Sequence, residues 1–154
     1  MGSDAHPPSC ELCDGDGGAL IVRHDKWRIV QVGGVEGAAY GGFCRVVWNA
    51  HVKEMSDLSV TEQQQFMAAV FALEAVLRES LKPDKMNLAS LGNLTPHLHW
   101  HVIPRYQTDG AFPKPIWAVA TPTSPKNFSG NTANADWVSA AKRRFAAPNF
   151  HQEP

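Results

Sequence analysis

Three histidines stand two residues apart in the segment HLHWH, at His97, His99 and His101. Side chains alternate between the faces of a β-strand, so a strand here would place all three imidazoles on one side and Leu98 and Trp100 on the other. Clustered imidazoles are poor core material, because each neutral ring has two polar nitrogens to satisfy. Two chemistries stay open for such a row: metal binding, or nucleophilic and acid–base catalysis near neutral pH.

A second candidate site is the pair Cys10 and Cys13 in the sequence CELC. Two cysteines separated by two residues make half of a tetrahedral zinc site, and two further ligands are then needed. The alternative is a pair of free thiols in an N-terminal turn. The third cysteine, Cys44, lies in an apolar run and is expected in the core.

The composition excludes several functional classes. The chain has 154 residues, 44% of them hydrophobic and 19% charged, which is typical of one globular domain. Its 14 basic and 15 acidic side chains give a net charge of −1, which argues against a nucleic-acid partner. No apolar run approaches the ~18 residues of a membrane helix, so we expect no membrane partner. With no apolar leader and few cysteines, a cytoplasmic location is expected.

The remaining sequence predicts strands around one long helix. The helix begins at Ser59, which forms a capping-box pattern with Glu62, and ends before Pro83. Its apolar residues recur at helical spacing: Phe66, Val70, Leu73, Leu77 and Leu81. The predicted strands are 19–23, 27–32, 43–48, 86–90 and 97–103, with a glycine-rich loop at 33–42 and a closing helix at 136–146. This order favours an α+β architecture, in which Pro104 ends the histidine strand.

Residues 97–106, HLHWHVIPRY, are similar to the signature of the histidine-triad (HIT) family, in which three histidines alternate with apolar residues. The resemblance extends more loosely over 10–106, through the CxxC pair, the segment GFCRVVWNAH and the amphipathic helix. It implies an α+β fold with an antiparallel five-stranded sheet and two main helices. Residues 1–9 are then expected to form a flexible tail and residues 10–150 a single HIT domain.

The resemblance also implies an activity. Family members are nucleotidyl hydrolases or transferases that act at the α-phosphate of small nucleotides, either dinucleoside polyphosphates or nucleoside phosphoramidates. By position, His99 is the nucleophile that forms a nucleotidyl-histidine, His101 donates to a phosphate oxygen, and His97 orients the pair. Asn93 corresponds to a residue that positions the leaving group, and it is expected to bind the nucleotide together with Ser90 and His101. No catalytic cofactor is expected.

The metal site and the alternatives follow from the same resemblance. Some relatives complete a Cys₂His₂ zinc site at the positions of His51 and His97, so Cys10, Cys13, His51 and His97 are the candidate ligands of a structural zinc ion. His97 would then support the catalytic strand instead of moving protons. Two other functions stay open: a metalloenzyme with the three-histidine row as its ligands, and a nucleotide-binding protein without turnover.

Family members pair as homodimers, and a homodimer is expected here. Three large apolar residues, Trp117, Trp137 and Phe145, lie in segments that a small sheet would leave uncovered.

Arg105 follows the histidine strand, where a solvated arginine is more common than a phosphate contact.

Overall fold

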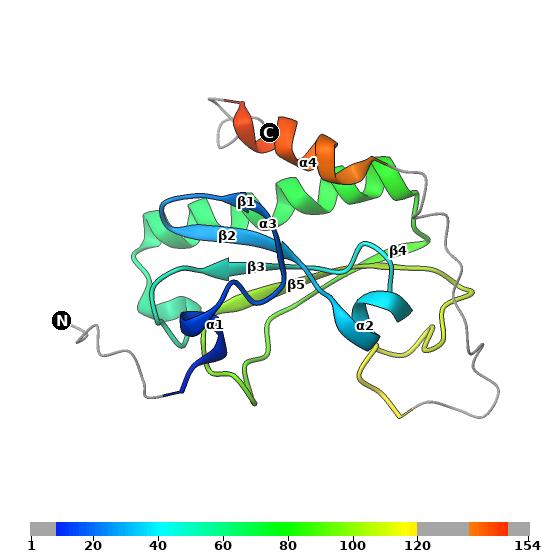
Figure 1. The fold of residues 1–154 in the computed structure, drawn as a ribbon, viewed down its shortest axis with the longest axis horizontal. Coiled ribbons are helices and arrows are strands. Elements are labelled where there is room, and N and C mark those ends of the chain that lie inside the picture. The colour runs from blue at the N-terminus through cyan, green and yellow to red at the C-terminus, as the bar shows by residue number, and fades with distance from the viewer. Residues whose placement is uncertain (1–8, 120–135, 148–154) are drawn as a thin grey trace.

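The sheet has five antiparallel strands in the order β1-β2-β3-β5-β4 in the computed structural model, which describes residues 9–119 and 136–147 (Figure 1). The strands are β1 (Ala19–Arg23), β2 (Trp27–Gln31), β3 (Cys44–Trp48), β4 (Lys85–Ala89) and β5 (His99–Arg105). The helices are α1 (Glu11–Asp14), α2 (Gly34–Ala39), α3 (Val60–Leu81) and α4 (Trp137–Ala146), with a 3₁₀ turn, η1 (Met55–Asp57). This confirms the α+β prediction of a five-stranded antiparallel sheet with two main helices.

Helix α3 covers one face of the sheet, and α4 packs beside it against β1 (Figure 1). Ser59 and Glu62 form the predicted capping box, and the helix ends at Leu81, just before Pro83. The whole predicted apolar stripe is buried: Phe66, Val70, Leu73, Leu77 and Leu81. The main core therefore lies between α3 and the sheet face that carries Leu98 and Val102.

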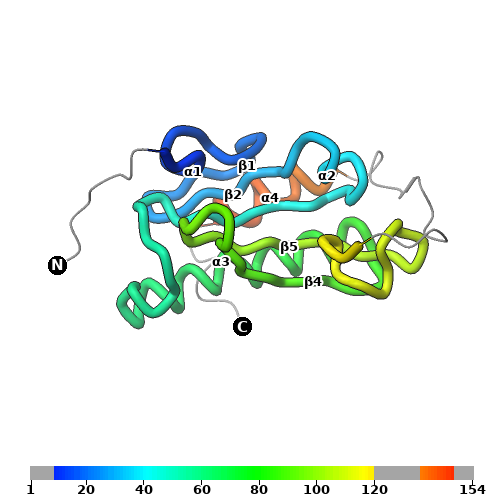
Figure 2. Tube along the Cα trace, turned by 90° about the horizontal axis from the view of Figure 1, so that it is seen from below, coloured from blue at the N-terminus to red at the C-terminus, as the bar shows by residue number. Residues whose placement is uncertain are grey.

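The opposite face of the sheet carries α1 and α2. Leu12 of α1 packs against Val30 and Val47, whose side chains point away from α3. Figure 2 shows α1 and the segment that follows β5 at opposite ends of the molecule.

The prediction of a loop over 33–42 is wrong in part, because Gly34–Ala39 form α2. Glycine disfavours helices, so its density in this segment indicated a loop. The structure gives Gly37 a packing role instead: a Cβ there would collide with the carbonyl oxygen of Val32. The glycine is needed for close approach of α2 to the end of β2.

The bounds of the histidine strand also differ from the prediction of 97–103. β5 begins at His99 and continues through Pro104 to Arg105. His97 and Leu98 precede it, and the Leu98 backbone N–H donates a hydrogen bond to the Val52 carbonyl. Pro104 is tolerated because β3 pairs with β5 only as far as Val102, so the missing N–H interrupts no hydrogen bond to β3.

Two of the three aromatic residues that suggested an interface pack within the chain, Trp137 as a buried residue and Phe145 as a half-buried one. Trp137 is buried in the main core, and Phe145 packs edge-on against Trp27. They therefore give no support to a homodimer.

Among the described residues, no helix is both long and apolar enough to cross a membrane. Residues 1–8 of the predicted tail lie outside the described residues, and so do residues 120–135.

Arg105 is not solvated, contrary to the prediction, since only 2% of its surface is exposed. Its Nε and Nη2 donate to Asp109 at 2.7 and 3.0 Å, Nη1 donates to Asn87, and Nη2 also donates to the Lys114 carbonyl. The Asp109 carboxylate also accepts backbone N–H groups of the following turn, including that of Phe112. This ion pair holds the segment after β5 against the sheet.

Burial disfavours the charged form of Asp109, but hydrogen bonds from Arg105 and from backbone amides outweigh it and hold its pKa below the ordinary value. We expect Asp109→Asn to destabilise the fold by about 3–5 kcal/mol, because it leaves the buried Arg105 charge unpaired. The carboxylate's contribution is fully present above the unfolded-state pKa, ~3.9, and is lost as pH falls through the lower folded-state value.

Urea denaturation at several pH values checks this prediction. The difference in unfolding free energy between the wild type and Asp109→Asn should be full at pH 7 and should shrink below about pH 4. The exposed Asp25→Asn is the matched control and should change stability by no more than ~0.5 kcal/mol. A difference that is absent at pH 7, or constant down to pH 2, would contradict the role of the carboxylate.

Candidate functional site

Two of the three histidines, His99 and His101, lie on β5 and face away from α3. In the register of the sheet, His99 is opposite Val47 and His101 is opposite Arg45 on β3. Val47 belongs to the small cluster under α1, which fixes the face to which His99 points. The predicted separation of faces is confirmed, since Leu98 and Val102 are in the core beneath α3.

The His99 ring is held by the backbone of its own segment. Its Nδ1 lies 2.6 Å from the carbonyl oxygen of His97, which can only accept a hydrogen bond, so Nδ1 carries the proton. In a neutral ring, Nε2 then keeps its lone pair. Burial lowers the pKa of His99, against the opposing effect of the bond to His97, and favours this neutral form.

His101 stands next to His99, with ring centroids 4.8 Å apart and nearly perpendicular planes. The aromatic rings of Phe43 and Trp117 lie 5.6 and 4.9 Å from it. Burial, reinforced by His99 and Arg45, lowers the pKa of His101 to about 3, so the ring is neutral at physiological pH. Within the described part of the chain, its Nδ1 is buried and has no hydrogen-bond partner.

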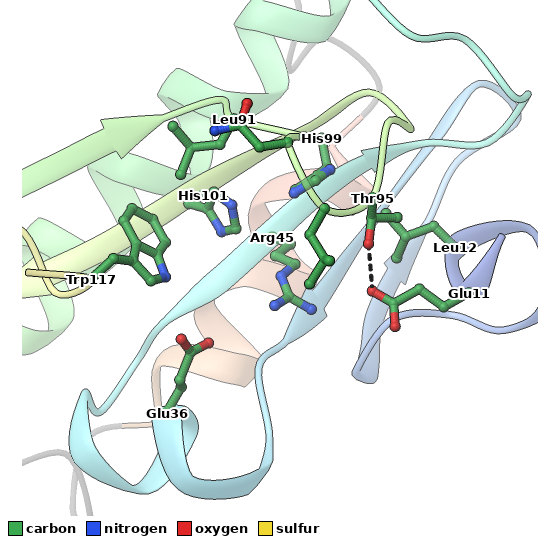
Figure 3. Close-up of a pocket in the computed structure, with 12 residues that line it drawn as sticks. Glu11, Leu12, Glu36, Arg45, Leu91, Thr95, His99, His101 and Trp117 are labelled. Carbon is green, nitrogen blue, oxygen red and sulfur yellow. Dashed lines mark hydrogen bonds between the residues drawn. The ribbon is translucent and has the colours of Figure 1, made fainter.

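A cavity of about 350 Å³ opens over these two histidines (Figure 3). It is bounded by α1, the loop before the triad, α2 and the segment after β5. Its lining residues are Glu11, Leu12, Glu36, Arg45, Leu91, Gly92, Asn93, Leu94, Thr95, His99, His101 and Trp117. The cavity offers both apolar walls and polar groups beside the two rings.

The predicted nucleotide-binding residues take different positions. Asn93 is exposed and lines the cavity, as a residue that contacts a ligand must. Ser90 is not among the lining residues. Its hydroxyl donates to the His99 carbonyl at 2.7 Å and so fixes the backbone of the first residue of β5.

Of the twelve lining residues, sequence reasoning predicted Asn93, His99 and His101, and the missed residues include Arg45, Glu36 and Trp117. Arg45 was included in a strand of predicted core residues, but alternation places it on the histidine face, and this was the available signal. Glu36 was placed in a loop. Trp117 was assigned to an interface, and only the fold brings it beside His101.

The four predicted metal ligands, Cys10, Cys13, His51 and His97, come together. Their ligand atoms all lie within 4.8 Å of one another. The Cys10 sulfur lies 3.4 Å from His97 Nδ1, and the Cys13 sulfur lies 3.4 Å from Nδ1 of both His51 and His97. Ligands of a tetrahedral zinc ion are separated by about 3.3–3.8 Å, given zinc's usual bond lengths, so the donors fit such an ion.

The His97 ring is oriented as a metal ligand. Its Nε2 lies 2.7 Å from the Trp48 carbonyl and must donate to it, which leaves Nδ1 with a lone pair toward the cysteines. Burial and the neighbouring Cys10 raise the pKa of the Cys13 thiol to about 11. Metal binding must therefore displace the thiol proton, so that affinity falls in acid.

A buried arginine fastens the cysteine segment to the sheet. Arg28 of β2 donates to the carbonyls of Leu12, Gly15 and Asp16. Thr95, in the loop before the triad, donates to Glu11 of α1, as the dashed line in Figure 3 shows. The cysteine segment is thus connected to both the sheet and the loop before the triad.

The histidine row does not form a single ligand set. His97 faces the cysteines, whereas His99 and His101 line the cavity. Within the described ranges, the only group of three or more potential ligands that could hold an ion is Cys10, Cys13, His51 and His97. The geometry therefore gives no support to the metalloenzyme alternative.

The sequence and the fold are similar to those of known proteins. Residues 36–108 match the family model described as the HIT domain. The structure is similar to a histidine triad protein from Bradyrhizobium japonicum, with a TM-score of 0.63, 27% identity and coverage of 83% of this chain and 90% of that chain. A histidine triad protein from Marinobacter aquaeolei gives a TM-score of 0.60 at 26% identity and covers 74% and 80%.

A curated relative is the bis(5'-adenosyl)-triphosphatase of Saccharomyces cerevisiae, which is 33% identical over 61 residues, or 36% of this chain. The match covers 30% of the yeast enzyme, so the chain spans about a third of the length of the curated relatives it matches.

Proposed function

We propose that this chain is a nucleotidyl hydrolase or transferase in which His99 attacks the α-phosphate of a small nucleotide. The match of residues 36–108 to the HIT-domain model and the similarity to solved histidine triad proteins support this proposal. The proposed substrate class comprises dinucleoside polyphosphates and nucleoside phosphoramidates. The name of the yeast relative, bis(5'-adenosyl)-triphosphatase, points to one compound of the first kind. The observation that carries the proposal is the hydrogen bond from His99 Nδ1 to the His97 carbonyl, because it leaves Nε2 as a nucleophile in a cavity of suitable size.

The proposed reaction has two displacements. In the first, His99 Nε2 forms a bond to the α-phosphorus while the bond to the leaving group breaks, and the leaving group takes up a proton from solvent where its own pKa requires one. In the second, water attacks the same phosphorus and loses a proton to solvent, the phosphorus–nitrogen bond breaks, and nucleoside monophosphate leaves with the His99 ring neutral again. An acceptor other than water in this step would make the reaction a transfer.

The neighbouring side chains support this chemistry. A neutral His101 can donate one N–H to a phosphate oxygen, where negative charge builds in the transition state. Asn93 can donate from its amide to the leaving group or the nucleotide. Ser90, predicted to bind nucleotide, acts in this proposal through the His99 backbone instead.

We also propose that Cys10, Cys13, His51 and His97 hold a structural zinc ion. Two thiolates and two imidazoles are a zinc donor set, and the ring orientation of His97 supports this use. A bound ion would fix the His97 segment, whose carbonyl holds His99. No step of the reaction requires the ion.

The homodimer also remains a proposal. Strands β1 and β4 both end the sheet, so each has one edge without a partner strand among the described residues. An edge of this kind can be covered by the same edge of a second copy. A cytoplasmic location remains an expectation from the sequence.

Incubation with a panel of diadenosine polyphosphates and adenosine phosphoramidates, followed by chromatography, tests the activity. The proposal predicts release of adenosine monophosphate from at least one class without added metal. Tight binding of these nucleotides with no product at any enzyme concentration would favour the non-catalytic alternative.

A further inference from the structure

Arg45 lines the cavity, and the proposed reaction gives it no role. It lies on β3 directly opposite His101 in the sheet register, so its side chain extends from the same face. Figure 3 shows Arg45, His99 and His101 directed into one cavity from two neighbouring strands. Among the lining residues, Arg45 is the only arginine or lysine.

The Arg45 guanidinium is anchored but not satisfied. Nη1 donates to the Gly17 carbonyl at 3.1 Å, whereas Nε is buried and has no acceptor among the described residues. Two other arginines of the sheet differ: Nε of Arg28 donates to a backbone carbonyl, and Nε of Arg105 donates to a carboxylate. A buried donor without an acceptor is unfavourable, so a ligand that supplies one gains affinity.

Among the described residues, Arg45 forms no salt bridge with a carboxylate. The salt bridges of the described residues involve other cations, and none joins Arg45 to Glu11 or Glu36, which line the same cavity. Glu11 instead accepts a hydrogen bond from Thr95. Arg45 is held in place, forms no salt bridge with a carboxylate among the described residues, and lies in the same cavity as His99. Such an arginine is suited to bind phosphate oxygens.

We infer that Arg45 binds the leaving phosphate of the substrate and selects phosphoanhydrides over phosphoramidates. This rests on the proposed function and narrows its substrate class. When a phosphoanhydride is cleaved, negative charge builds on the departing phosphate, and a guanidinium beside it stabilises that charge. A phosphoramidate releases an amine, which offers Arg45 no anion to bind.

Steady-state kinetics with diadenosine triphosphate and adenosine 5'-phosphoramidate test the selection. We expect Arg45→Met to lower kcat/KM for the triphosphate by roughly 10- to 100-fold, and for the phosphoramidate by about threefold or less. Arg45→Lys, which keeps the charge, should show the same preference with a smaller loss. Arg23→Met, at an exposed arginine on β1, is the matched control and should change neither value. Equal losses on both substrates would overturn the inference.

A binding measurement separates this inference from the proposed function. Titration calorimetry with inorganic tripolyphosphate needs no turnover, and we expect Arg45→Met to weaken its binding by about tenfold or more. Unchanged affinity in both Arg45→Met and Arg45→Lys would overturn the role of Arg45 even in an active enzyme. The wild type could cleave neither nucleotide while Arg45→Met still weakens tripolyphosphate binding. In that case the proposed reaction fails and the anion site at Arg45 stands. Arg45→Lys provides the test if Arg45→Met does not fold.

Discussion

His99→Ala is expected to lower kcat by on the order of 10⁴-fold or more, because it removes the atom that forms the covalent bond to phosphorus. The ring donates a hydrogen bond to the His97 carbonyl and lines an open cavity, so its loss should leave the fold intact. Single-turnover kinetics on the best substrate of the panel, together with a thermal melt, measure both effects.

The control for this variant is another histidine outside the cavity. His24 stacks on Trp27 in the β1–β2 hairpin, and His24→Ala should retain the wild-type rate. His101→Ala should fall between the two, since it removes one donor to the phosphate and not the nucleophile. Wild-type turnover by a folded His99→Ala protein would contradict the assignment.

The second large effect is expected from the metal cluster. If the proposed zinc ion is bound, the Cys10→Ser, Cys13→Ser double variant should lose it together with at least ~4 kcal/mol of stability, because the ion would connect the N-terminal segment to His51 and His97. This corresponds to a fall in melting temperature of roughly 10–15 °C. At a temperature where the variant is folded, its kcat should fall far less than that of His99→Ala.

Elemental analysis of protein purified without chelator, alongside calorimetry, checks this second prediction. Cys44→Ala is the matched control: this cysteine is fully buried in the main core, so its loss should reduce stability but leave metal content unchanged. Native protein that is free of metal, and that melts at the same temperature as the double variant, would rule out a structural ion.

Periodicity predicted the parts of this fold that depend on one dominant local signal. The helical stripe from Phe66 to Leu81 and the alternation from His97 onward each determine which face is buried. The prediction of a loop over 33–42 was wrong in part, because glycine propensity indicates a loop, whereas Gly37 allows a close contact with Val32 that only the folded chain reveals.

The candidate site was predictable where its residues are adjacent in sequence. The triad and the cysteine pair were found from spacing, and the family resemblance added His51. The buried network of Arg105 could not be predicted, because its acceptors, Asp109, Asn87 and Lys114, acquire their positions from tertiary packing. The same limit applies to Trp117, which reaches His101 through the segment that this network holds.

The proposed reaction passes through a covalent nucleotidyl-histidine on His99. The stereochemistry at phosphorus tests this intermediate most directly. The substrate is a diadenosine triphosphate with one defined α-phosphorothioate centre, hydrolysed in ¹⁸O-labelled water, and the measurement is the configuration of the released thiophosphate. Two successive in-line displacements, by His99 and then by water, predict overall retention. Inversion would show that water attacks directly and would contradict the intermediate.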